Sequence, residues 1–175
     1  MSETRVDPTV TGLFLVGFIT LFFGLLGIDL FQDAANNGLV DVAGNFIGVI
    51  GIIMVVLAYM AGKSGNAFAT ALFAFVAVAL FGVRYGIGET VAFPVVFYAI
   101  AFFFVIFAIV AFLVGAPKLV VILLFLVALL YFFVGLWFGY EESSYAAAFG
   151  VFGILSFLVA TYSAVGLGTQ KLPVF

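Results

Sequence analysis

The chain has 175 residues, of which 67% are hydrophobic and 7% are charged. Soluble domains carry about 25% charged residues, so we expect the main solvent of this chain to be lipid. Cysteine and histidine are absent, which excludes disulfides, thiolate chemistry, imidazole general bases and most transition-metal sites. Eight acidic and five basic residues give a net charge of −3, which leaves no basic surface for nucleic acid.

Charged residues divide the sequence into six charge-free windows of at least 20 residues each. A helix rises about 1.5 Å per residue, so about 20 residues cross a hydrocarbon core of about 30 Å. We therefore predict an all-α membrane protein in which residues 1–175 form a single transmembrane domain. The six predicted transmembrane helices cover residues 9–28, 42–61, 66–84, 92–114, 118–138 and 145–167.

The first two predicted helices are rich in glycine. The first follows Asp7-Pro8, which is typical of an N-cap residue and a proline at the first helical position. Small residues let helix backbones approach closely in lipid, where the hydrophobic effect does not drive helices together. The glycines therefore indicate either packing within the chain or the interface of a homo-oligomer. They are Gly17, Gly24 and Gly27 in the first helix, and Gly44, Gly48 and Gly51 in the second.

The third predicted helix, 66–84, begins at Gly65-Asn66, just after a lysine. Asn66, Thr70 and Phe73 follow the i, i+4, i+7 spacing and therefore share one face of the helix. One interpretation is local: Asn66 caps the helix, and the Thr70 hydroxyl bonds to a carbonyl one turn earlier. The other is that this face lines a solute path, with Gly65 letting a solute approach the backbone.

The last three predicted helices contain few polar side chains. Tyr98 is one of them in the fourth helix, and the fifth helix opens after Pro117. The sixth helix has a small, mildly polar face made by Gly153, Ser156, Ala160 and Ser163. We expect this face to avoid lipid, either because it packs on another helix or because it lines the same path as the face of the third helix.

No Asp, Glu, Lys or Arg lies inside any of the six charge-free windows, which cover residues 8–28, 42–62, 64–83, 90–117, 119–140 and 143–170. Ionisable residues within the bilayer usually mark proton relays, pumps and voltage sensors, so we do not expect one of these. The sequence also contains no evident acid–base pair or nucleophile constellation, so we predict neither an enzyme nor a bound cofactor or metal.

The basic residues predict the orientation of the chain. With six helices, both termini and the even-numbered connections lie on one side of the membrane. That side holds Arg5, Lys63, Lys118 and Lys171, whereas Arg84 is alone on the other. Cytoplasmic loops carry an excess of Lys and Arg, so we predict a multi-pass cell-membrane protein with both termini in the cytoplasm.

Four segments, in order along the chain, resemble the patterns of one known family. "DPTVTGLFLVGF" (7–18) is similar to its N-P-A-P-L-G-L signature at the start of the first helix, with Asp7, Pro8 and Gly12 in matching places. "GNAFATALF" (65–73) is similar to its G-N-T-F-G-x-T-A-F segment. "VFYAIAFFF" resembles its fourth helix, and "GVFGILSFLVATYSAVG" (150–166) its sixth. The family is the acetate uptake transporters, or succinate–acetate/proton transporters.

The resemblance implies a ring-shaped homohexamer of small six-helix subunits, each with its own pore for acetate and related short carboxylates, taken up with protons. The substrate-path residues that the pattern and the resemblance suggest are Gly65, Asn66, Thr70, Phe73, Tyr98, Ser156 and Tyr162. The family's constriction combines aromatics on the first and third helices with a leucine on the fifth. The nearest positions here are Phe18 (or Val16), Val76 (or Phe75) and Leu126 (or Val127).

We therefore expect a membrane channel or transporter for acetate and related short carboxylates, which move with a proton or as the protonated acid. Its expected partners are the carboxylate, protons, the lipid bilayer and further copies of the chain. One alternative is a channel for a neutral solute such as urea or a short amide. The other is an accessory membrane subunit without a pore, in which both polar faces are buried against other helices.

Overall fold

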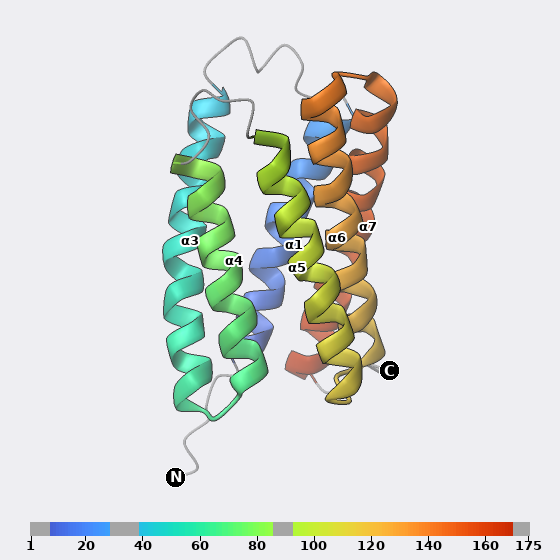
Figure 1. The fold of residues 1–175 in the computed structure, drawn as a ribbon. Coiled ribbons are helices and arrows are strands. Elements are labelled where there is room, and N and C mark those ends of the chain that lie inside the picture. Colours follow the sequence, from blue (N-terminus) through green and yellow to red (C-terminus); the bar gives the residue numbers. More distant parts are fainter. Residues whose placement is uncertain (1–7, 29–38, 86–92, 170–175) are drawn as a thin grey trace.

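The computed structural model describes residues 8–28, 39–85 and 93–169. The described residues form six helices and the short connections between some of them (Figure 1). The helices are α1 (Pro8–Gly27), α3 (Leu39–Lys63), α4 (Ala67–Tyr85), α5 (Phe93–Leu113), α6 (Lys118–Tyr140) and α7 (Ser143–Thr169).

Each of the six helices contains a segment that is long and apolar enough to cross a membrane. The prediction of a helical fold with six helices long and apolar enough to span a membrane is therefore confirmed for the described residues. The helix ends differ somewhat from the predicted ones: α3 begins at Leu39 instead of residue 42, and α7 extends to Thr169 instead of residue 167. Asp7 and the charged residues of 1–6, 29–38, 86–92 and 170–175 lie outside the described residues.

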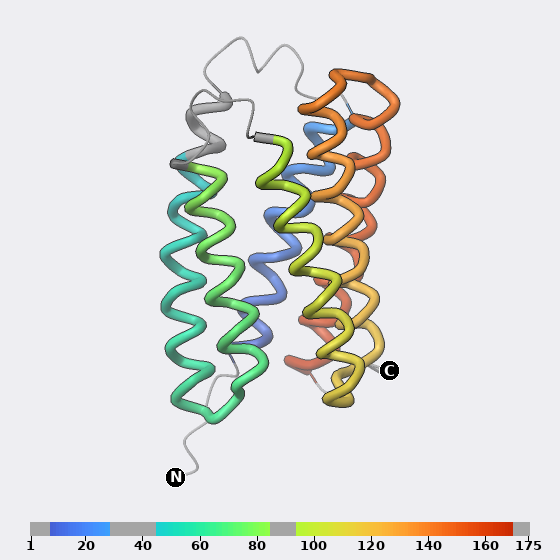
Figure 2. The backbone as a smooth tube through the Cα atoms, viewed as in Figure 1, coloured from blue at the N-terminus to red at the C-terminus, as the bar shows by residue number. Residues whose placement is uncertain are grey.

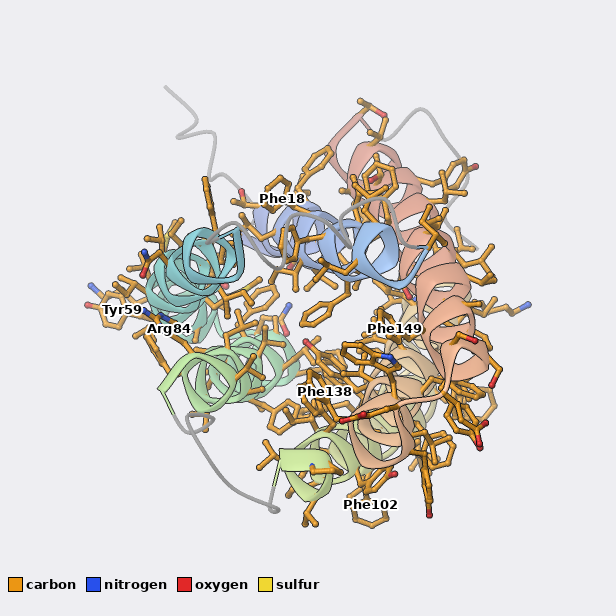
Figure 3. All side chains as sticks on the ribbon, turned by 90° about the horizontal axis from the view of Figure 1, so that it is seen from above. Phe18, Tyr59, Arg84, Phe102, Phe138 and Phe149 are labelled. Atoms are coloured by element: carbon orange, nitrogen blue, oxygen red, sulfur yellow. The ribbon has the colours of Figure 1, made fainter. Side chains whose placement is uncertain are left out.

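The helices form a ring in chain order, which is seen from above in Figure 3. The most extensive contacts join α1 to α7, α5 to α6, α3 to α4 and α6 to α7. The contact between α1 and α3 is much smaller, and that between α4 and α5 is smaller again. The backbone trace in Figure 2 therefore divides into an α3–α4 hairpin and a larger group of α1, α5, α6 and α7.

Glycines set the closest contact of the ring, between α1 and α7. A Cβ added to Gly153 would lie 2.6 Å from the Cα and N atoms of Gly24 and 2.6 Å from the carbonyl oxygen of Thr20. Gly51 of α3 similarly accommodates the ring of Phe81 on α4, where a Cβ would lie 3.3 Å from ring carbons. These glycines therefore serve packing within the chain, which is one of the two interpretations of the sequence.

Phenylalanine rings fill the wide seam between α4 and α5. The ring of Phe75 lies with its centroid 5.2 Å from that of Phe103 and 5.4 Å from those of Phe104 and Phe107. Phe68, nearer the start of α4, lies 6.2 Å from Phe107. Large side chains thus connect two helices whose backbones make few close approaches.

Tight turns close the end of the bundle at which α1 begins and α7 ends (Figure 1). Gly65 has φ +80° and Gly115 has φ +72°, a left-handed conformation that glycine adopts without steric cost. The following amide completes the helix end in both turns: Asn66 N–H donates to the Ala61 carbonyl at 3.0 Å, and Ala116 N–H to the Ala111 carbonyl at 2.9 Å.

The charged side chains that the structure describes differ between the two ends of the bundle. Lys63 and Lys118 lie at the end that carries the two glycine turns, and the Lys63 Nζ is 5.0 Å from the centroid of the Tyr59 ring. Glu141 and Glu142 lie at the opposite end, where they connect α6 to α7. Arg84 lies near the same end, and its Nη2 donates to Asn45 Oδ1 at 3.0 Å, which ties α4 to α3.

Candidate functional site

The start of α4 contains the polar pair that the sequence singled out. Asn66 Oδ1 accepts a hydrogen bond from the Ala69 N–H at 3.0 Å, and the Thr70 hydroxyl donates to the Asn66 carbonyl at 2.8 Å. Asn66 therefore caps α4, as the local interpretation predicts. Gly65 and Asn66 are both exposed, and a Cβ on Gly65 would meet nothing within 4 Å. The backbone at the start of α4 is therefore open to the surroundings.

Phe73 and Gly12, from two separate motifs of the sequence, meet inside the bundle. Phe73 is 2% exposed, and a Cβ on Gly12 would overlap its ring atoms Cε1 and Cζ. Val76, one turn further along α4, is also buried. Gly12 thus provides the space on α1 into which the Phe73 ring fits, and Pro8 is buried one turn before it.

An aromatic cluster in the interior was not identified from the sequence. The Tyr131 ring, on α6, lies 5.7 Å from Phe104 and 6.1 Å from Phe97 in stacked geometries, and 5.8 Å from Phe23 edge-on. All four rings are buried, and they come from α1, α5 and α6. The available signal was Tyr131 itself, a polar residue in the middle of a long apolar window.

The predicted constriction residues occupy different environments. Phe18 is 50% exposed and lies on the outward side of α1 (Figure 3), whereas Val76 is buried and Leu126 is half-buried. Of the alternative positions, Val16 is half-buried and packs against the core, and Val127 is buried. The described contacts therefore do not bring Phe18 together with the other two residues.

The two predicted path tyrosines are likewise apart from the interior. Tyr98 packs against α6, where a Cβ on Gly135 would lie 2.7 Å from its Cε1 and the Phe132 ring lies 5.7 Å away. Tyr162, on α7, is exposed.

Ser156 and Ser163 on α7 are fully buried, and neither hydroxyl has a hydrogen-bond partner among the described residues. Other hydroxyls of the chain bond to backbone carbonyls: Thr20 to Gly17 at 3.0 Å, Ser64 to Ala61 at 2.8 Å, Thr70 to Asn66 at 2.8 Å and Thr169 to Val165 at 2.7 Å. Leaving a buried polar group unsatisfied costs about 1–3 kcal/mol. Two such groups on one helix require an explanation.

The fold and the interior together define the class of protein. Six helices suited to span a bilayer form a ring, and the described residues place no Asp, Glu, Lys or Arg among the buried side chains. Thr20, Ser156 and Ser163 are the buried polar side chains of this part of the chain, apart from the Tyr131 hydroxyl. The chain is therefore an α-helical, multi-pass membrane protein, and the side chains that the structure describes place no charge in its interior.

One protein of known structure is similar to this chain. The bacterial acetate channel SatP superimposes on 98% of this chain and 100% of its own, with a TM-score of 0.75 and 18% sequence identity. This likeness establishes a shared fold, which agrees with the family resemblance of the four sequence segments. A scan against known protein families and a search of curated proteins each find no match.

Proposed function

We propose that the chain forms a channel or transporter for acetate and related short carboxylic acids, which cross the membrane with a proton, as the neutral acid. The observation that carries the proposal is an interior without any described charged side chain, in a fold shared with the bacterial acetate channel SatP. The polar side chains that the described residues bury there are Thr20, Ser156, Ser163 and Tyr131, all of which carry hydroxyls.

The hydration energy that a carboxylate ion would lose favours passage of the neutral acid. A carboxylate that leaves water without a cation beside it loses far more hydration energy than a few hydrogen bonds return. Each hydrogen bond to a charged group contributes only about 1.5–3 kcal/mol net. A protonated acid avoids most of that cost, and the exposed N-terminal end of α4 at Gly65 and Asn66 can receive the solute at the surface.

We further propose that the end with Lys63 and Lys118 faces the cytoplasm, which places both termini there, in the cell membrane. We also propose a homo-oligomer, a ring-shaped hexamer with one path per subunit. Its support is the family resemblance of the four sequence segments. The glycines of α1 and α7 pack within the subunit, so they do not support the proposed oligomer.

The proposal is tested by uptake of radiolabelled acetate into proteoliposomes, with and without an inward proton gradient. Protein-free liposomes are measured in parallel, because neutral acids also cross lipid unaided. We expect protein-dependent entry that the gradient increases. Urea flux without acetate flux would point to a neutral-solute channel instead, and flux of neither would indicate an accessory subunit.

A further inference from the structure

Buried side chains from all six helices fill the centre of the bundle. They include Leu13 of α1, Met54 of α3, Phe73 of α4, Phe97 of α5, Leu123 of α6 and Phe149 of α7. Protein interiors are close-packed, with few voids larger than a water molecule. A larger solute can therefore pass through this interior only if side chains turn aside or helices separate, and the contacts between helices indicate where separation costs least.

The α3–α4 hairpin is held together at both ends and between them. At one end the Arg84 Nη2 donates to Asn45 Oδ1 at 3.0 Å, and at the other the left-handed turn at Gly65 joins the two helices. Between these ends, Gly51 of α3 accommodates the Phe81 ring of α4. The contacts between the two helices are extensive, so the hairpin can move as one unit without coming apart (Figure 2).

The other four helices form a second unit. α1 and α7 approach so closely that a Cβ on Gly153 would lie 2.6 Å from the Gly24 backbone. α5 and α6 fit together at Gly135, where a Cβ would lie 2.7 Å from Cε1 of Tyr98. α6 and α7 also make extensive contacts. Separating any of these pairs would remove close packing, which is a main source of helix association in lipid.

The two boundaries between these units have the smallest contacts between neighbours around the ring. On the α1 side, the Phe73 ring of α4 fits over Gly12. On the α5 side, the Phe75 ring contacts that of Phe103, which is 46% exposed, and that of Phe104, which is 3% exposed. When these rings separate they meet lipid tails, which are as apolar as the rings, so separation costs less here than within either unit.

We propose that the α3–α4 hairpin moves as a rigid unit away from α1 and α5, and that this movement opens the interior of the bundle to the solute. The movement lifts Phe73 from Gly12 and draws Phe75 away from α5, while α1, α5, α6 and α7 keep their contacts. It is a rigid-body displacement of the kind by which many binding sites open and close. Its role as a gate rests on the proposed function, whereas the movement itself does not.

Single-cysteine variants test the movement without any solute, because the chain has no native cysteine. Ala77 lies one turn after Phe73 on the inner face of α4 and is 2% exposed. Val76 is 5% exposed, and cysteine there adds no volume, so it provides a second reporter. Ala160 is the matched control, because it is 0% exposed and lies 3.3 Å from the Cβ position of Gly17, at the α1–α7 contact that the movement leaves closed.

The variants are treated in proteoliposomes with the small neutral reagent methyl methanethiosulfonate, and mass spectrometry follows the reaction. We expect Ala77→Cys and Val76→Cys to react roughly tenfold faster than Ala160→Cys, because only the hairpin boundary opens transiently. Equal rates at the three positions would overturn the proposal.

Paired cysteines test whether the movement gates transport. Phe75→Cys with Phe103→Cys spans the seam, where the two ring centroids are 5.2 Å apart. Gly51→Cys with Phe81→Cys is the control pair, because it joins α3 to α4 within the hairpin. Each pair is linked in detergent with a short bis-methanethiosulfonate, whose disulfides a reductant removes, and is then reconstituted. The unlinked form of each pair is its own reference.

We expect the link across the seam to lower protein-dependent acetate entry by about fivefold or more, and reduction to restore it. The link within the hairpin should leave entry within about twofold of the unlinked form. Phe68→Cys with Phe107→Cys, whose ring centroids are 6.2 Å apart, joins the same seam nearer the Lys63 end and should behave as the first pair does.

Acetate entry that neither seam link changes would overturn the proposal and indicate that side chains turn aside instead. If the wild-type protein carries no acetate but Ala77→Cys still reacts faster than Ala160→Cys, the proposed function fails and the movement stands. If acetate enters normally but the two cysteines react equally, the movement fails and the proposed function stands.

Discussion

At the contact between α1 and α7, glycine determines how closely the two helices approach. Gly153 faces the backbone of Gly24 so closely that a Cβ would lie 2.6 Å from it. In lipid, where apolar burial gives helices little reason to associate, such backbone proximity supplies much of the packing energy. A single methyl group at this position must therefore separate the two helices or strain them.

We predict that Gly153→Ala destabilises the protein by about 1–3 kcal/mol, the usual cost of overpacking. Gly82→Ala is the matched control, because a Cβ at Gly82 meets nothing within 4 Å and alanine favours a helix by up to about 1 kcal/mol. Thermal unfolding in mild detergent, followed by the fluorescence of the single tryptophan, checks both variants. Equal midpoints for the two variants would contradict the packing derived for Gly153.

A second residue-scale prediction separates two roles of Asn66. The Asn66 side-chain oxygen caps α4 through the Ala69 N–H, and serine can replace it in that bond, whereas alanine cannot. Asn66→Ala should therefore cost about 0.5–2 kcal/mol of stability, and Asn66→Ser much less. If the amide also faces the solute, as we propose, acetate entry should fall in both variants. Wild-type entry in Asn66→Ser would limit Asn66 to capping.

At the scale of helices, the contacts between neighbours around the ring differ in extent. The α3–α4 hairpin makes extensive contacts within itself and limited ones with α1 and α5. Its attachment to α5 depends on the rings of Phe68 and Phe75, which reach across to Phe103, Phe104 and Phe107. Removing a ring at this seam should thus loosen one pair of helices from the other four.

We predict that Phe75→Ala lowers stability by about 2–4 kcal/mol, near the range for loss of a core phenylalanine. Phe102→Ala is the control, because Phe102 is 64% exposed on the outer side of α5 and should change stability by no more than about 0.5 kcal/mol. Unfolding midpoints in detergent measure both. A Phe75→Ala variant as stable as the control would show that the seam contributes little to holding the hairpin.

The helices were predictable from the sequence because charged residues mark their ends and lipid requires about 20 apolar residues per span. The capping of α4 by Asn66 was predictable as one of two alternatives, since it depends on neighbours in sequence. The cluster around Tyr131 was not predictable, because it depends on which faces of α1, α5 and α6 meet, and helices that are apolar on all sides carry no such signal. For the same reason the outward position of Phe18 could not be anticipated.

For the whole molecule, the distribution of charge between the two ends determines its orientation in the membrane. Lys63 and Lys118 lie at one end, and Glu141 and Glu142 at the other. Since positive loops remain in the cytoplasm, this asymmetry predicts one orientation for all six helices.

We predict that a membrane-impermeant thiol reagent added to intact cells labels the Glu141→Cys variant and leaves Lys63→Cys unlabelled. Both positions are exposed, so reactivity differs only by side of the membrane. Permeabilised cells serve as the control, in which both variants should react. Labelling of Lys63→Cys in intact cells would reverse the proposed orientation.

The central claim is that the solute crosses without charge, through an interior in which the described residues place hydroxyls and rings and no cation. The most direct test is the initial rate of acetate entry into proteoliposomes at fixed total acetate, with external pH varied from 7 to 5 and membrane voltage clamped at several values. For an acid of pKa about 4.5 the neutral fraction rises roughly 80-fold over this range. We predict that protein-dependent entry rises with that fraction and is independent of voltage. Entry that stays constant with pH and follows voltage would identify the anion as the permeating species and contradict the account.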